Sequence, residues 1–238
     1  MAGCQYLQVS GSPQRNRRSR SDRRDRPALR HNGAVPQPPV VSRVVVLAGP
    51  SGIGKSRLAA LTGLPVLRLD DFYRSGGDPE LPLITHGANA GLVDWDDPRS
   101  WHAQAAVRAI VELADTGRTV APVYDIARNG PSGTHEVTLG GATLFVAEGI
   151  FAQQIVADCR QRGVLAAAFC LRQHPLVTFW RRLTRDLREH RKPPLVLVRR
   201  GWALMRDQQR VIADAQSLGC VVVSPSEANT RIRRLASG

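Results

Sequence analysis

Short apolar runs recur along the chain from Val40 onward, and each is bounded by glycine, proline or polar residues. Runs of about four to eight aliphatic or β-branched residues are typical of buried strands. Each run is short and ends at glycine, proline or polar residues, and this distinguishes it from a long buried helix. We predict strands at 44–47, 65–69, 119–124, 142–147, 164–171 and 220–223, with a small hairpin arm at 137–139.

Amphipathic patterns fill the intervals between the predicted strands. Within 98–114, apolar side chains recur on one side at helical spacing, as expected of a helix that covers a core. Near the end of the chain, Ser224, Pro225 and Glu227 supply an N-cap, a first-turn proline and a capping-box acid. The predicted helices are 55–61, 98–114, 174–191, a segment from Pro194 to about 216, and a last helix from 225.

The alternation of strands and helices predicts an α/β fold in which helices cover both faces of a parallel sheet. The 238 residues are enough for one such domain, which we place at 40–238. Residues 70–98 fit neither pattern and are rich in proline and glycine. Because long connections in compact domains usually carry function, we expect this segment to contribute to a site.

Residues 1–39 are rich in arginine, serine and proline and almost free of large apolar side chains. Such a segment cannot bury enough surface to offset its ordering entropy, so we expect a disordered basic arm. A solvated tail, an early start codon, an arm for nucleic acid or an acidic partner, and a transit peptide remain open. Eight arginines and two aspartates before residue 40 account for +6 of the net charge of +13, so the remainder is moderately basic.

Composition narrows the functional classes. The four cysteines have no metal-ligand or redox spacing, and no apolar run reaches the roughly 18 residues of a spanning helix. We therefore expect a reduced cytoplasmic protein without a membrane segment. A moderately basic body suits a protein that binds phosphates and does not require nucleic acid as a partner.

The segment from Gly49 to Ser56 reads Gly-Pro-Ser-Gly-Ile-Gly-Lys-Ser, between a predicted strand and a predicted helix. Its glycines let successive N–H groups point at one phosphate, and the helix N-terminus adds positive potential. In such a loop Lys55 reaches the β- and γ-phosphates of ATP, and the Ser56 hydroxyl binds Mg²⁺. The alternative is a glycine-rich turn without function. The predicted nucleotide-binding set is Gly49, Ser51, Gly52, Ile53, Gly54, Lys55, Ser56 and Arg57.

Two acids follow predicted strands. Asp70 comes after the strand 65–69, where a carboxylate beyond the strand end lies close to a bound γ-phosphate and can take a proton from an acceptor hydroxyl. Glu148 ends the strand 142–147 and is a candidate for the Mg²⁺ shell, directly or through water. An acidic turn and a surface carboxylate are the alternatives.

A basic helix is predicted at 174–191, with Arg182 and Arg185 among its arginines. Arginines on a mobile helix can close over the phosphates and stabilise the charge in transfer. We therefore expect an Arg-rich lid with Arg185 in a catalytic role, and the alternative is a solvated basic face.

The segments GPSGIGKS, LDDFY, DWDDP, PVYD, VAEGIF and RRLTRD occur in this order. Together, over about 43–192, they resemble the uridine kinase branch of the uridine kinase–phosphoribulokinase family of P-loop kinases. The resemblance implies that Asp70 activates the acceptor and that Tyr73 lines its pocket. It also implies that Asp96 binds ribose hydroxyls, that Tyr124 meets the base, and that Arg182 and Arg185 act from the lid.

Three places depart from the family pattern. The segment written N-F-D-H-P in the family is here Asp94-Trp-Asp-Asp-Pro98, and Asn129 stands where the family has a histidine. The lid's E-R-G-R is Glu189-His-Arg-Lys192. These changes leave phosphoryl transfer expected and the identity of the base open.

The sequence thus predicts a kinase that uses ATP and Mg²⁺ to phosphorylate a hydroxyl of a small molecule, most directly a uridine- or cytidine-like nucleoside. Two alternatives stay open. One is a kinase of a sugar, a vitamin precursor or a nucleotide, and the other is a nucleotide-binding regulator or ATPase that meets nucleic acid through the basic arm. The oligomeric state is open, and a homo-oligomer is compatible with the sequence.

Overall fold

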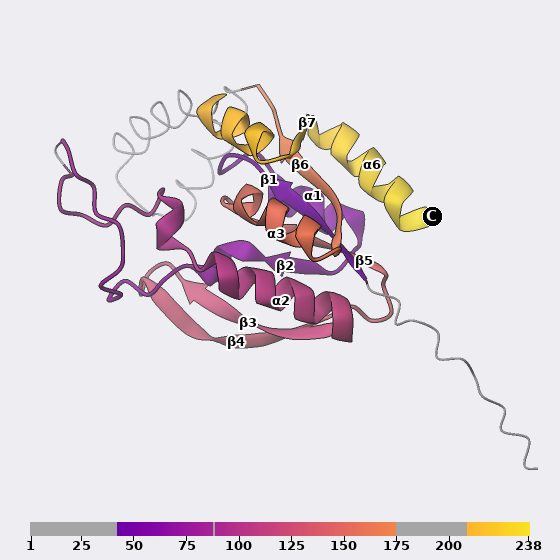
Figure 1. The fold of residues 1–238 in the computed structure, drawn as a ribbon, viewed down its shortest axis with the longest axis horizontal. Coiled ribbons are helices and arrows are strands. Elements are labelled where there is room, and N and C mark those ends of the chain that lie inside the picture. Colours follow the sequence, from indigo (N-terminus) through magenta and orange to yellow (C-terminus); the bar gives the residue numbers. More distant parts are fainter. Residues whose placement is uncertain (1–41, 88, 175–208) are drawn as a thin grey trace, which may run out of the picture. The chain divides into compact units, whose positions relative to one another are not determined.

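The apolar runs form the strands of a parallel sheet in a computed structural model, which describes residues 42–87, 89–174 and 209–238. In the described part of the chain, five parallel strands lie in the order β2-β5-β1-β6-β7 (Figure 1). The predicted parallel α/β fold is therefore confirmed. The strands are β1 (Arg43–Ala48), β2 (Val66–Arg68), β5 (Leu144–Glu148), β6 (Leu165–Leu171) and β7 (Val221–Val223).

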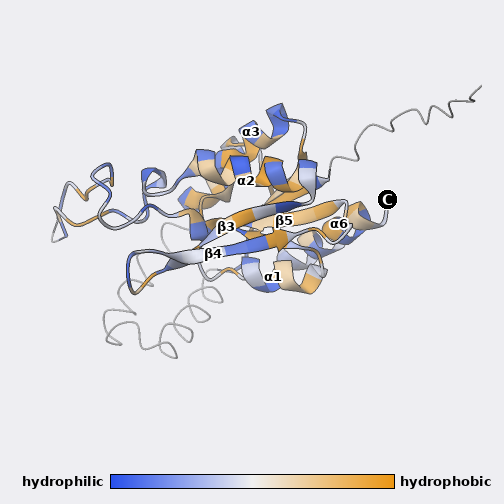
Figure 2. Ribbon diagram, turned by 90° about the horizontal axis from the view of Figure 1, so that it is seen from below, coloured by the Kyte–Doolittle hydropathy of each residue, from blue (hydrophilic) through white to orange (hydrophobic). Residues whose placement is uncertain are grey.

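Two apolar layers cover the sheet, because alternate residues of β1 face opposite sides. Val44 and Val46 pack with α2 (Ala103–Thr116) and α3 (Val156–Gln161). Val45 and Leu47 pack with α1 (Lys55–Thr62) and α6 (Pro225–Ser237). Figure 2 shows these two pairs of helices on opposite sides of the strands. A sheet covered on both faces needs apolar residues at every position of its strands, because the side chains on both faces are buried.

An antiparallel hairpin stands apart from the parallel sheet. Strands β3 (Arg118–Asp125) and β4 (Gly130–Thr138) form their own two-stranded sheet, and β3 packs against α2. The predicted arm at 137–139 was too short, because β4 has nine residues. Its central residues are exposed on both faces, so their polar pattern gave no strand signal.

Other elements also differ from the sequence prediction. The segment 98–114 begins as a 3₁₀ turn at Pro98–Ser100, and α2 starts only at Ala103 because Trp101 pairs with Tyr73 in an extended bridge. Strand β2 ends at Arg68, and Leu69–Phe72 form another 3₁₀ turn. The 3₁₀ turn Ala152–Ile155 and α3 were not predicted.

The last helix begins with the predicted Ser224 N-cap and first-turn proline, whereas the described hydrogen bonds do not include the reciprocal bond of a capping box from the Ser224 N–H to Glu227. The Ser224 hydroxyl accepts the Glu227 N–H at 3.2 Å, which satisfies one N-terminal donor. The Glu227 carboxylate pairs with Arg231 at 2.6 Å, one turn further along. Residues 209–217 are helical, as expected for the end of the preceding helix.

The basic arm 1–39 and the lid helix lie outside the described residues, apart from His174 at the start of the predicted helix. None of the helices in residues 42–87, 89–174 and 209–238 has both the length and the apolar character that a membrane crossing requires.

Candidate active site

The carboxyl edge of the sheet brings the predicted chemistry together. Strand β5 lies between β2 and β1, and Glu148 is in register with Arg68 on one side and Leu47 on the other. The glycine loop therefore follows β1 directly beside Glu148, and Asp70 follows β2 on its other side. These residues line one cavity of about 360 Å³, whose lining comprises Ser51, Gly52, Gly54, Lys55, Ser56, Arg57, Asp70, Glu148 and Ile150.

The glycine loop has the backbone curvature of a phosphate cradle. Gly49, Gly52 and Gly54 adopt φ of 137°, 79° and 104°, in the region that favours glycine. A side chain at Gly49 would also be crowded, because a Cβ there would lie 3.1 Å from the Leu171 carbonyl oxygen. Gly54 is the N-cap of α1, so the positive end of the helix faces the cavity. This combination of curved backbone and helix terminus can bind an anion.

Lys55 is buried beneath the phosphate loop. Its side chain lies under the loop at 7% exposure, and Nζ donates to the carbonyls of Gly49 at 2.8 Å and Pro50 at 3.3 Å. Its ammonium is thus held by the loop itself. Ile53 is also buried, and its N–H donates to the Pro50 carbonyl at 3.3 Å, so its side chain anchors the loop in the core.

Glu148 has the environment of a cation ligand. It is 4% exposed, and its Oε2 has no hydrogen-bond partner among the described residues; the nearby Ser56 hydroxyl helps to lower its pKa. Burial raises the pKa of this carboxyl; the Asp70 carboxylate adds to that shift, and the Lys55 charge opposes it. A buried carboxylate oxygen without a donor, next to a hydroxyl, fits the hard oxygen ligands that Mg²⁺ prefers.

A metal held here would need oxygens from a bound phosphate as well. Across residues 42–87, 89–174 and 209–238, no cluster of three or more His, Cys, Asp or Glu side chains could hold a metal by itself. A Mg²⁺ site that is shared with substrate phosphates needs only a few protein ligands, such as one carboxylate and one hydroxyl, because the ion also binds waters and phosphate oxygens.

Asp70 lies in the 3₁₀ turn after β2 and is fixed by the segment that follows β5. Its Oδ1 accepts the Ile150 N–H at 2.8 Å, and Oδ2 has no hydrogen-bond partner in the part of the chain that is described. This contact requires glycine at 149, because a Cβ there would lie 2.9 Å from Asp70 Oδ1 and 2.8 Å from Leu69 Cβ. Sequence analysis did not single out Gly149, although a glycine directly after the strand acid is a visible signal.

Asp71 faces a different neighbour from Asp70. It is 6% exposed, and its Oδ1 accepts the Tyr124 N–H at 3.3 Å, which ties the 3₁₀ turn to β3. Arg68 Nε lies 3.7 Å from its other oxygen. The two adjacent acids therefore have different neighbours: Asp70 lines the phosphate cavity, and Asp71 bonds to the hairpin.

Three aromatic rings gather beside Asp70. Tyr73 lies 5.9 Å from Trp95 and 5.6 Å from Tyr124 between ring centroids, and Trp95 lies 6.5 Å from Tyr124. The Tyr73 hydroxyl donates to the Trp95 carbonyl at 3.3 Å, and the buried Tyr124 hydroxyl has no partner among the described residues. Burial raises the pKa of Tyr73 strongly, and the carboxylates of Asp70 and Asp96 add to the effect. The sequence analysis mentioned Trp95 only as a difference from the family motif, whereas the structure places it against Tyr73 and Tyr124.

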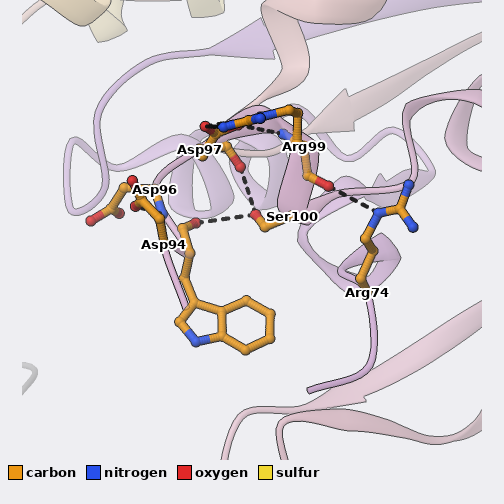
Figure 3. A network of polar contacts seen from close by, with 7 residues as sticks. Arg74, Asp94, Asp96, Asp97, Arg99 and Ser100 are labelled. Atoms are coloured by element: carbon orange, nitrogen blue, oxygen red, sulfur yellow. Dashed lines mark hydrogen bonds and ion pairs between the residues drawn. The ribbon is translucent and has the colours of Figure 1, made fainter. Parts of the chain in front are cut away.

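Asp96 is exposed beside the cluster, and its N–H donates to Asp94 Oδ1 at 3.1 Å. Figure 3 shows its carboxylate pointing away from the polar network of Asp97, Arg99 and Ser100. Asn129 lies in the β3–β4 turn with φ of 49°, and its carbonyl accepts the Gly76 N–H at 2.5 Å. The predicted lid residues Arg182 and Arg185 lie outside the described residues.

Two comparisons with known proteins agree with this arrangement. The chain is 27% identical over 151 residues to uridine kinase from Saccharomyces cerevisiae, a match that spans 60% of this chain and 29% of the yeast protein. A putative fructose transport system kinase from Silicibacter sp. TM1040 shares the fold with a TM-score of 0.53 at 20% identity, over 75% of this chain and 87% of that one. No protein-family model matches the chain.

The fold is thus that of P-loop kinases, with a central parallel sheet flanked by helices. The resemblance to uridine kinases that the motifs indicated is confirmed by the sequence match. The chain spans less than a third of the length of the curated relative, so the acceptor has to be argued from the site.

Proposed function

We propose that the protein is an ATP-dependent kinase that transfers the γ-phosphate to a hydroxyl of a nucleoside-like acceptor, with uridine and cytidine as the first candidates. One observation carries the proposal. The cavity that holds the glycine loop also contains Asp70 and Glu148, and an aromatic cluster around Tyr73 lies directly beside Asp70. A phosphate donor site and a proton-accepting carboxylate therefore share one space, next to faces that suit a planar ring.

The loop and α1 supply the donor side. Backbone N–H groups of the curved loop and the N-terminus of α1 bind the phosphates of ATP. Lys55 is fixed at the loop by two carbonyls, so its positive charge stands at the same place before the nucleotide arrives. Preorganised charge of this kind stabilises the transferred phosphoryl group without reorganisation during the reaction.

Ser56 and Glu148 would hold Mg²⁺ beside the phosphates. When bound, the ion neutralises charge on the phosphate oxygens. The Ser56 hydroxyl and the unpartnered oxygen of Glu148 supply protein ligands of the type it needs. Burial disfavours the charged form of Glu148 and the Lys55 charge only partly offsets this, so a cation at this place further stabilises the carboxylate.

Asp70 acts on the acceptor. The Ile150 N–H fixes Oδ1, and Oδ2 accepts the proton of the attacking hydroxyl. Because Gly149 leaves no side chain between Asp70 and β5, the carboxylate is held at the edge of the phosphate cavity rather than free in solvent. A positioned base of this kind contributes about 10²–10⁴-fold to the rate.

The aromatic cluster favours a nucleoside over a bare sugar. Tyr73, Trp95 and Tyr124 lie within 6.5 Å of one another between ring centroids, and stacking on an aromatic ring stabilises a planar base by about 1–3 kcal/mol per contact. The exposed carboxylate of Asp96 can accept hydrogen bonds from ribose hydroxyls, which is the role that the family resemblance implies. Arg182 and Arg185, on the predicted lid, are proposed to approach the phosphates when substrate is bound.

A panel of acceptors with γ-labelled ATP and Mg²⁺ tests the proposal. We expect label to transfer to uridine or cytidine with a kcat/KM at least tenfold above that for fructose, pantothenate or a nucleoside monophosphate. The Asp70→Asn variant should lose this transfer while binding ATP as before. Preferred phosphorylation of a sugar or a vitamin precursor would keep the kinase and refute the nucleoside.

The other class of function, a nucleotide-binding regulator or ATPase associated with nucleic acid, makes a different prediction. It would hydrolyse ATP without an acceptor, and its affinity for nucleic acid would fall steeply with salt. Labelled inorganic phosphate as the sole product across the whole acceptor panel would favour this class over the kinase.

A further inference from the structure

The loop 75–99 contains Trp95 and Asp96, which we place on the acceptor side, and a short antiparallel pairing closes its base. Residues 75–99 lie between Tyr73 and Trp101, which pair in an antiparallel bridge. The Arg74 N–H donates to the Ser100 carbonyl at 2.9 Å, and the His102 N–H donates to the Phe72 carbonyl at 2.9 Å. Further along the loop, Leu83 pairs with Val93 and the Asp94 N–H donates to the Pro82 carbonyl at 2.8 Å. These backbone contacts join the middle of the two arms, and none of them reaches the returning residues Arg99 and Ser100.

The Arg74 side chain extends this closure into the loop. Nε donates to the Arg99 carbonyl at 2.9 Å, and Nη1 donates to Asp78 at 2.8 Å and to Glu80 at 2.9 Å. One guanidinium thereby joins the outgoing and returning arms, and its side chain is only 21% exposed. Figure 3 shows Arg74 reaching the carbonyl of Arg99 from below the returning arm.

The returning arm in turn fixes Trp95. The Ser100 hydroxyl donates to the Asp97 carbonyl at 2.7 Å and lies 3.4 Å from the Trp95 carbonyl, which also accepts the Tyr73 hydroxyl. The Asp97 carboxylate accepts the Arg99 N–H at 2.8 Å and closes the 3₁₀ turn. The position of the indole and of the adjacent Asp96 thus depends on where Arg99 and Ser100 are held.

We propose that Arg74 is a positioning residue for the acceptor, because its guanidinium holds loop 75–99 so that Trp95 and Asp96 stand at the acceptor pocket. This role rests on the proposed kinase function. It also requires arginine specifically. A planar fork of five N–H donors serves a carbonyl and two carboxylates at once, whereas a lysine ammonium on a flexible stem cannot reach all three.

Steady-state kinetics test the role with three variants. In Arg74→Ala we expect the acceptor KM to rise about tenfold or more, while kcat stays within about threefold and the ATP KM is unchanged. Arg74→Lys should fall between wild type and alanine, because it keeps the charge and loses the fork. Arg118→Ala is the matched control, since Arg118 is exposed at the start of β3 and its variant removes the same charge away from the loop.

Hydrogen exchange gives a readout that does not depend on turnover. Arg74→Ala should speed exchange in peptides covering 72–80 and 95–102 and leave the β1 and β5 peptides as in wild type. A uniform increase that includes β1 and β5 would mean general destabilisation and overturn the positioning role. Unchanged exchange in the loop peptides would overturn it as well.

The two proposals fail in different ways. If wild type phosphorylates an acceptor and Arg74→Ala leaves its KM unchanged, the positioning role is wrong and the kinase assignment stands. If wild type phosphorylates no acceptor in the panel, the kinase assignment is wrong and the positioning role falls with it.

Discussion

The two adjacent aspartates after β2 allow a sharp separation of catalysis from stability. Asp70 lines the phosphate cavity with one oxygen bonded to the Ile150 N–H, whereas Asp71 is buried and bonded to the Tyr124 N–H. We expect Asp70→Asn to lower kcat by about 10² or more, the usual scale for removing a positioned base. The amide oxygen can still accept the Ile150 N–H, so the fold should keep its stability.

The companion substitutions at Asp71 should show the opposite pattern. Asp71→Asn keeps an oxygen for the Tyr124 N–H, and the lost partner, Arg68, is an exposed side chain at 3.7 Å that contributes little. We expect kcat within about threefold of wild type. Asp71→Ala leaves the Tyr124 N–H without its acceptor and should lower the free energy of unfolding by about 1–3 kcal/mol.

Two measurements decide between these roles. Initial rates at saturating ATP and acceptor give kcat for each variant, and urea unfolding followed by circular dichroism gives the free energy of unfolding. A larger loss of kcat in Asp71→Asn than in Asp70→Asn would reverse the assignment. Negligible loss in both would remove these aspartates from the mechanism.

Three further outcomes are expected. Lys55→Ala should reduce phosphoryl transfer more than tenfold with circular dichroism unchanged, and transfer within tenfold of wild type would refute the loop assignment. Asp96→Ala and Tyr124→Ala should weaken acceptor binding far more than ATP binding, measured by titration with each ligand; the reverse order would place the pocket elsewhere. Burial raises the pKa of Glu148 above its ordinary 4.5, so its folded form binds more protons than its unfolded form, and stability should fall as pH rises from 4.5 through the raised value. Glu148→Gln should abolish that fall in metal-free unfolding experiments, and an unaltered pH profile would contradict the reasoning.

The phosphate loop could be predicted from sequence because its geometry is local. Three glycines at fixed positions allow the positive φ angles that the curved backbone needs, and the strand and helix around them follow from short patterns. The burial of Lys55 could not be predicted in the same way. It depends on how the loop folds back over the first turn of α1, where the carbonyls of Gly49 and Pro50 meet the ammonium.

The structure around the proposed acceptor site was harder to predict from sequence, because it depends on contacts between segments that are distant along the chain. Strand β4 is polar at nearly every position, so its existence follows from pairing with β3 rather than from its own pattern. The residues after β2 form a 3₁₀ helix instead of continuing the strand. In that helix, Asp70 accepts a hydrogen bond from the N–H of Ile150, which is 80 residues further along the chain. No periodicity within either segment carries this information.

The separation of the β3–β4 hairpin from the parallel sheet has an evolutionary consequence. Tyr124 and its neighbours belong to a two-stranded sheet that shares no backbone ladder with β1 or β5, and it is attached near the site through Asp71 and through the Asn129 carbonyl. Substitutions in the hairpin can therefore accumulate without shifting the register that sets Glu148 beside the glycine loop. If the proposed function holds, changes of acceptor can arise in the hairpin while the phosphate loop and Glu148 stay in place.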